Sequence, residues 1–361
     1  NVVTSRVNRD KVNWFGSSPK GVEMPDLIRT RDPWFRPVDL QFGPDGALYI
    51  ADFYNRIIGH YEVRLDHPER DREKGRIWRL IYNGTSSQRL SKPVSLPNSE
   101  LDVVIGELAS PLLSRRMLAA EFMADDMGVS VSKPLKKAIH NNDASPELKV
   151  HGAWVLYRLA KLDQSTLLRF STDDSPLVRS HMHRIAGAKG NWDPVISKMV
   201  LDGLMDDSPF VRRASADALS RRPHVDNLHP LLSALKVVDE KDEHLRHALR
   251  IALRNNLRLA DRLSDFEDLK TDKVALSHLL KVALAVDTSF SSELLLANID
   301  ALEIEESQMT KNLRHIARNA PKEGLDNLVR IVQKRYKDDM DFQVELLLAI
   351  NEGILQRGLQ V

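Results

Sequence analysis

Polar side chains that could bind a cofactor gather near the ends of short apolar segments in the first 88 residues: Asp39, Asp52, Tyr54, Asn55 and His60. Carboxylate and amide oxygens are the donors that calcium takes in proteins, so these residues are the candidate cofactor site of the chain. The alternative is structural: the two aspartates accept hydrogen bonds from turn amides, and the tyrosine packs between the blades of a β-propeller. We favour the structural interpretation.

Histidines offer a second possible chemistry. His244 and His247 lie three residues apart beside Glu243, and His181 and His183 lie two apart. A metal site needs three or four converging ligands, and no third ligand stands at a suitable spacing, so we predict no metal site. The chain has no cysteine, which excludes disulfides, thiolate zinc sites and covalently attached c-type haem within it.

The composition narrows the function classes further. Lys and Arg number 52 against 51 Asp and Glu, a net charge of +1, so the clustered positive charge that nucleic acid requires is not expected. No apolar run reaches the roughly 18 residues of a membrane span. We find no glycine-rich phosphate loop, serine nucleophile elbow or His-Glu-x-x-His motif, so the sequence names no catalytic residue. A strand-like segment begins at Asn1, and we expect the chain to be a piece of a longer polypeptide.

A recurring phrase gives the strongest architectural signal. It consists of Ser-Pro, an apolar residue two places after the proline, and then a basic residue. Its anchors lie 35, 30, 33 and 34 residues apart, at Pro111, Pro146, Pro176, Pro209 and Glu243. Self-similarity at this period indicates stacked helical hairpins, so the chain is expected to be mainly α.

Each phrase also predicts the start of a helix. Serine or aspartate at the N-cap satisfies free backbone N–H groups, and proline is tolerated at the first helical position. Second helices are predicted between the phrases, over 133–140, 166–171, 194–205 and 228–238. Helical spacing continues without proline anchors over 273–286, 291–302, 306–319, 325–336 and 342–357.

The basic residues of the phrase form a ladder with one member in each repeat: Lys149, Arg179, Arg212 and Arg246. We expect these side chains to bind carbonyl or aspartate oxygens of a neighbouring turn, with Asp174 and Asp207 close by. The alternative is a stripe that binds an acidic partner. The weaker first copy departs from the pattern, with Ser114 at the basic position.

The N-terminal region has a different pattern. Strands are predicted over 38–42, 47–52, 56–61 and 76–81, with a hairpin turn at 43–46, where Asp45 serves the turn rather than a calcium loop. Four short strands are the size of one propeller blade, and residues 1–15 could hold the outer strands of a preceding blade. We therefore expect a partial β-propeller over 1–88, a linker over 89–98 and an α-solenoid over 99–361.

Two resemblances follow from these residues. The turn phrase with a basic residue, repeating every 30–35 residues, resembles HEAT repeats over 99–260 and more loosely over 261–361. The segments 32–39, 43–54, 57–60 and 75–79 resemble the last propeller blade of large membrane-bound dehydrogenases of planctomycetes and verrucomicrobia. That propeller is similar to the one in glucose/sorbosone dehydrogenases. Members often carry His where this chain has Lys74 and Trp where it has Phe53.

The second resemblance implies a parent protein and its cofactors. In that family the propeller precedes HEAT repeats and commonly a c-type cytochrome domain, which implies pyrroloquinoline quinone, calcium and c-type haem in the full-length protein and a periplasmic or extracytoplasmic location. We expect no cofactor in this chain alone. Our first hypothesis is a non-catalytic scaffold that binds a protein partner or neighbouring domains. The alternative is part of an active sugar or alcohol oxidoreductase that passes electrons to a cytochrome.

Overall fold

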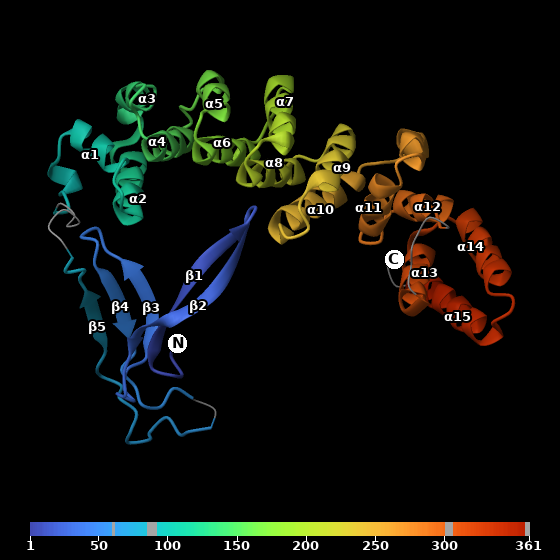
Figure 1. The fold of residues 1–361 in the computed structure, drawn as a ribbon, viewed down its shortest axis with the longest axis horizontal. Coiled ribbons are helices and arrows are strands. Elements are labelled where there is room, and N and C mark those ends of the chain that lie inside the picture. The colour runs from blue at the N-terminus through green and yellow to red at the C-terminus, as the bar shows by residue number, and fades with distance from the viewer. Residues whose placement is uncertain (60–61, 85–91, 300–305, 358–361) are drawn as a thin grey trace. The chain divides into compact units, whose positions relative to one another are not determined.

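The computed structural model describes residues 1–59, 62–84, 92–299 and 306–357 (Figure 1). The chain is mainly helical, with a small β region at its N-terminus, as the sequence predicts. It divides into two compact units. The first contains residues 1–15 and 19–169, and the second contains residues 16–18 and 170–361. The change from strands to helices falls between Leu80 and Leu96, and residues 85–91, which include the start of the predicted linker, lie outside the described residues.

Two antiparallel sheets make up the β region (Figure 1). Strands β1 (Arg6–Phe15) and β2 (Ser18–Arg29) form one sheet. Strands β3 (Pro37–Phe42), β4 (Leu48–Asp52) and β5 (Arg76–Leu80) form the other, in the order β3-β4-β5. A small core joins the sheets, with Val7, Phe35 and Ile50 buried and Ile28, Leu48 and Leu80 packed against them. The long strand β2 was not predicted from the sequence.

The predicted strand over 56–61 is wrong for its described part. Residues 56–59 form no strand, His60 and Tyr61 lie outside the described residues, and β4 pairs directly with β5. The physical reason is that local groups already occupy this backbone. Arg36 donates to the carbonyls of Asn55 and Arg56, and the Asn55 side chain accepts from the Ile57 amide.

In the first unit the helices alternate as the repeat predicts. They are α1 (Leu101–Glu107), α2 (Leu113–Phe122), α3 (Ser132–Ile139), α4 (Pro146–Arg158) and α5 (Gln164–Ser171), whose last two residues belong to the second unit. A short 3₁₀ turn (Leu96–Asn98) precedes α1, and a π turn (Met123–Met127) and a 3₁₀ turn (Gly128–Val131) link α2 to α3. Helix α4 packs against both α2 and α3.

In the second unit, α6 (Pro176–Ala188), α8 (Pro209–Arg221) and α10 (Glu243–Leu257) pack in succession (Figure 1). Helices α7 (Pro194–Asp202) and α9 (Leu228–Val237) alternate with them. Beyond these lie α11 (Lys273–Ala283), α12 (Ser289–Ala297), α13 (Glu306–Asn319), α14 (Lys322–Arg335) and α15 (Met340–Arg357). Short 3₁₀ segments occupy 203–205, 225–227 and 263–270. In the described part of the chain, no helix has the length and hydropathy that a membrane span needs.

The anchors of the repeat are helix starts. Helices α4, α6 and α8 begin at Pro146, Pro176 and Pro209, and α10 begins at Glu243. The side chain of Ser145 accepts a hydrogen bond from the Leu148 amide, as an N-cap should.

The other phrases differ in detail from the predicted capping. Ser175 and Ser208 occupy the N-cap positions without a capping side-chain bond. Instead, Asp173 and Asp206 accept from the amides of Ser175 and Ser208, so an aspartate turn orders the residues before each helix. Pro111 is not a helix start, since α2 begins at Leu113.

The apolar positions of the phrase form the core of the second unit. Val178, Val211 and Leu245 are each 0% exposed. The helices approach so closely that a Cβ at Gly203 would overlap the Ser215 hydroxyl and the His183 ring. His183 is 2% exposed, and its Nδ1 lies 3.0 Å from the Ser215 Oγ. Burial lowers the pKa of His183 to about 4.

Gly203→Ala tests this close packing. We expect a loss of about 1–3 kcal/mol in the free energy of unfolding, because the added methyl has no space. Gly106→Ala is the matched control: it lies in α1, where a Cβ meets nothing within 4 Å. That change should stabilise the helix by roughly 0.5–1 kcal/mol. Urea unfolding followed by circular dichroism measures both, and equal effects would contradict the packing.

The buried His183 predicts a pH dependence of stability. Its pKa is about 4 in the folded chain and about 6.5 when unfolded, so the unfolded state binds more protons between these values. Stability should therefore fall as the pH drops from 6.5 towards 4, by roughly 3 kcal/mol from this residue. His183→Gln should flatten the profile by that amount, whereas His247→Gln, on an exposed residue, should leave it unchanged. Parallel profiles for all three chains would refute the assignment.

Candidate functional site

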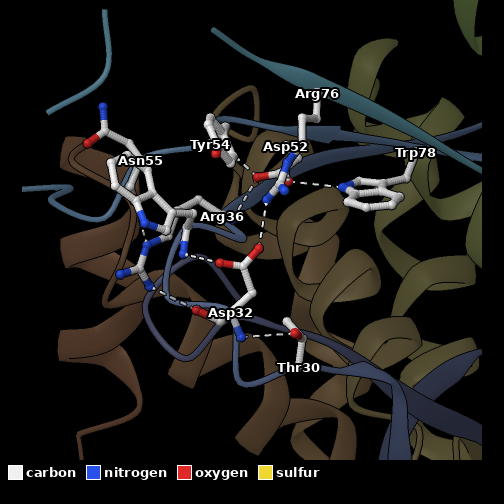
Figure 2. Close-up of polar contacts among 10 residues, drawn as sticks. Thr30, Asp32, Arg36, Asp52, Tyr54, Asn55, Arg76 and Trp78 are labelled. Atoms are coloured by element: carbon white, nitrogen blue, oxygen red, sulfur yellow. Dashed lines mark hydrogen bonds and ion pairs between the residues drawn. The ribbon is translucent and has the colours of Figure 1, made fainter. Parts of the chain in front are cut away.

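Asp52, at the end of β4, is the centre of a polar network in the β region (Figure 2). Its side chain is buried, and each carboxylate oxygen accepts two hydrogen bonds. One oxygen accepts from the amides of Arg36 (2.8 Å) and Tyr54 (2.9 Å). The other accepts from Arg76 Nε (2.8 Å) and Trp78 Nε1 (2.9 Å). A carboxylate has about four lone-pair positions, so this one is saturated.

Arg36 is the second member of this network, and it is buried with Asp52. Its guanidinium donates to the backbone carbonyls of Asn55 (2.9 Å) and Arg56 (2.9 Å). It also donates to the carbonyls of Val2 and Val3 at 3.0 Å each. These bonds fix the segment after β4 to the N-terminal residues of the chain, so the role of Arg36 is to bind backbone carbonyls of both segments.

Aromatic packing completes the network. The Arg76 guanidinium lies 4.0 Å from the centroid of the Tyr54 ring and forms an ion pair with Asp32 at 3.1 Å. Tyr54 has a backbone φ of +49°, and its ring centroid lies 5.2 Å from that of Trp34. The tyrosine therefore packs between an arginine and a tryptophan of the same β region.

Electrostatics keep Asp52 ionised. Burial acts to raise the pKa of this carboxyl, but the hydrogen bonds from the amides and from Trp78, together with the charge of Arg76, outweigh it. The result is a pKa below the ordinary aspartate value. An ionised carboxylate with every lone pair occupied by its own chain stabilises the fold.

The other predicted cofactor residues do not converge with Asp52. Asp39 is exposed, and its carboxylate accepts from the Leu40 amide and the Gln41 side chain. Asn55 is buried and donates to the carbonyl of Asp71 at 2.8 Å. His60 lies outside the described residues. Across the described ranges, no group of three or more His, Cys, Asp or Glu side chains is placed to hold a metal ion.

These positions do not fit a site for calcium and a quinone, because the buried carboxylate has no free acceptor and the exposed one stands apart. Asp45 likewise serves its turn: it accepts from Arg79 Nε at 2.9 Å and from the Ala47 amide at 3.2 Å. The sequence interpretation found Asp52, Tyr54 and Asn55 but missed their partners, Arg36 and Trp78. Arg36 could have been noticed in the sequence, because it is a charged residue between apolar neighbours directly before a predicted strand.

The basic ladder of the helical region makes contacts within its own stack. Arg179 holds both carboxylate oxygens of Asp206, at the next turn, at 2.8 Å each, and donates to the carbonyls of Asp173 (2.9 Å) and Asp174 (3.1 Å). The expected type of partner is present, but the side chain that pairs is Asp206 rather than Asp207. This geometry is bidentate and half-buried, and it raises the pKa of Arg179 through its bond to Asp206.

The arginines of the ladder share one backbone contact. This contact identifies the members of the ladder better than their position after the proline does. Arg179, Arg212 and Arg246 each donate to the carbonyl six residues earlier, at 2.9, 3.1 and 3.4 Å. In the first copy, Arg116 makes this contact with Ser110, at 2.6 Å. The basic position is therefore shifted by two residues rather than lost. Ser114 has another role: its hydroxyl donates to the Gly43 carbonyl of the β3–β4 turn.

A buried carboxylate also starts α10. Asp242 is 2% exposed and accepts from the Leu245 amide as an N-cap. It further accepts from the Ser17 amide and the Ser18 hydroxyl, at 2.7 Å each, within the second compact unit. The carboxylate of Asp242 is therefore occupied by bonds that hold the fold together.

Comparison with known proteins adds one family match. A family model described as "Domain of unknown function (DUF7133)" matches residues 1–84, the β region. No curated protein matches the chain. Among solved structures, the chain is similar to one described as "Crystal Structure of Engineered Protein", at 15% identity and a TM-score of 0.35, over 70% of this chain and 78% of that one. A likeness this distant supports no conclusion about function.

Two aspartates of the predicted site provide a matched test. Asp52→Asn places an amide NH₂ against groups that only donate and leaves Arg76 without its buried partner. We expect the free energy of unfolding to fall by roughly 2–4 kcal/mol. Asp39→Asn removes the same charge from an exposed side chain and should change it by less than about 0.5 kcal/mol. Thermal and urea unfolding measure both variants, and similar losses would contradict the assigned roles.

Proposed function

We propose that this chain is a non-catalytic scaffold whose HEAT-like hairpins hold a protein partner or neighbouring domains of a larger protein. One observation carries the proposal: the polar residues best suited to chemistry are occupied by bonds that hold the fold together. Asp52 is saturated by four donors, and Arg179 is held by Asp206 and two carbonyls. Stacked hairpins bury one face against each neighbour and leave long outer faces for binding.

The proposal also includes a parent protein. In it, the β region is the last blade of a β-propeller, and the helical region follows it in a membrane-bound, haem-associated dehydrogenase. The match over residues 1–84 supports a β region that recurs as a domain. Exposed apolar side chains on the three-stranded sheet, such as Phe42 and Ile77, also support it, because adjacent blades of a closed propeller cover such faces.

Cofactor reconstitution separates the scaffold from the oxidoreductase alternative. We expect the chain, incubated with calcium and pyrroloquinoline quinone, to show no shift in melting temperature, no change in quinone absorbance and no dye reduction with sugars or alcohols. The reason is that Asp52 has no free acceptor for the metal. Asp52→Ala gives a second check, because a cofactor response in the original chain that this change abolishes would overturn the proposal.

The parentage has its own test. The gene on both sides of this segment should encode further propeller blades upstream and a Cys-x-x-Cys-His haem motif downstream. Sequencing the flanking gene tests this parentage. Absence of both the blades and the haem motif would refute the dehydrogenase parent, and the scaffold role would still be tested separately by peptide binding.

A further inference from the structure

Four basic side chains lie on the adjacent helices α10 and α11 without a carboxylate partner. They are Arg246 and Arg250 on α10, and His278 and Lys281 on α11. In the described part of the chain, none of the four forms an ion pair; Arg246 donates only to the carbonyl of Glu240.

Several other cations of the same unit pair with a carboxylate. Arg179 pairs with Asp206, Lys198 with Asp202 and Lys236 with Asp272. The basic cluster of α10 and α11 differs from these pairs, because Arg246, Arg250 and Lys281 all act on His278 and no carboxylate is among the groups that do. Uncompensated like charges repel one another, so an anionic ligand that joins them would relieve this repulsion.

The four groups belong to one surface. Helices α10 and α11 pack against each other. Arg246 and Arg250 are one helical turn apart, as are His278 and Lys281, so each pair shares a helix face. Arg250 and Lys281 are exposed, and His278 is half-buried.

The electrostatics of His278 agree with this placement. Burial lowers its pKa first, and the charges of Arg250, Lys281 and Arg246 then act in the same direction. No carboxylate among the resolved causes opposes them.

We propose that the α10–α11 face binds an acidic segment of a partner protein, with two or more of its carboxylates on Arg250 and Lys281. This inference rests on the scaffold function and specifies the partner's chemistry and place. Residues one turn apart on a helix are about 6 Å apart. Arg246 and Arg250 of α10 have this spacing, which is close to the roughly 6.6 Å between alternate residues of an extended peptide, so carboxylates at every second position would match that helix face.

A nucleic-acid ligand is disfavoured by the same surface. Single-stranded nucleic acid binds to basic grooves in which aromatic side chains stack on the bases. Neither α10 nor α11 contains Phe, Tyr or Trp. The net charge of +1 also leaves little general attraction for a polyanion.

The basic ladder as a whole does not form the stripe for an acidic partner that was the alternative prediction. Arg179 is occupied by Asp206, so the whole ladder does not offer free cations. Of its members, Arg246 is the one that lies in the basic cluster. The predicted attraction for an acidic partner is therefore localised to α10 and α11.

The test is fluorescence anisotropy with the full chain and two labelled 12-residue peptides, one alternating Glu and Ser and the other alternating Gln and Ser. We expect saturable binding of the Glu peptide alone, weakening several-fold between 50 and 300 mM NaCl. Arg250→Gln with Lys281→Gln should reduce the affinity about tenfold or more. Lys198→Gln with Arg221→Gln removes two charges elsewhere and should leave the affinity unchanged. Circular dichroism and melting temperature confirm that each double variant is folded.

Several outcomes would overturn the inference. They are absence of binding by the original chain, equal binding of the two peptides, and equal losses in the two double variants. Tighter binding of a twelve-nucleotide thymidine oligomer at the same residues would assign the face to nucleic acid instead. These readouts involve no quinone or calcium, so failure here is distinguishable from failure of the reconstitution experiment.

Discussion

The turns between the helices impose the constraint on which the helical region depends. Helices that pack as closely as α6 and α8 need turns of fixed geometry between them, and donors to the turn carbonyls supply it. The chain supplies them from the following helix, through an arginine that reaches back six residues. Because a guanidinium carries several donors in a fixed plane, Arg179 can also bind the carboxylate of Asp206 at the next turn. One residue type thus fixes the geometry within a repeat and, at this position, the spacing between repeats.

The β region solves the same problem with a different residue set. The segment after β4 is irregular, and its carbonyls would be unsatisfied without the guanidinium of Arg36. Asp52 holds the backbone of Arg36 in place and binds Arg76 and Trp78 from β5. A buried ion pair with full hydrogen bonding specifies one arrangement more than it adds stability. In the described residues, Asp52 and Asn55 therefore serve the irregular segment that follows β4.

How much of this could be predicted depends on how local each interaction is. The starts of α4, α6 and α8 follow from a serine and a proline adjacent in sequence, and their positions were predicted correctly. The bounds of α13, Glu306–Asn319, also follow from helical spacing. In contrast, the bond between Trp78 and Asp52 joins residues 26 apart, and no spacing rule identifies such a pair. The role of Arg116 was missed for a related reason, because alignment to the proline assumed a helix start that the structure places two residues later.

Some charged side chains are bonded within the chain and others are not, and this difference indicates where such a scaffold would bind a partner. A side chain whose donors are all used by its own chain can bind a ligand only by giving up those bonds, which costs about as much as the new bond contributes. Arg36 and Arg179 are in that position, and Arg179 is also a residue that the repeat pattern selects. Arg250 and Lys281 match no motif and lie at exposed positions of helices that other residues already stabilise. Their charges remain available because the fold does not need them. A ligand can therefore bind these residues without breaking a bond that the fold requires.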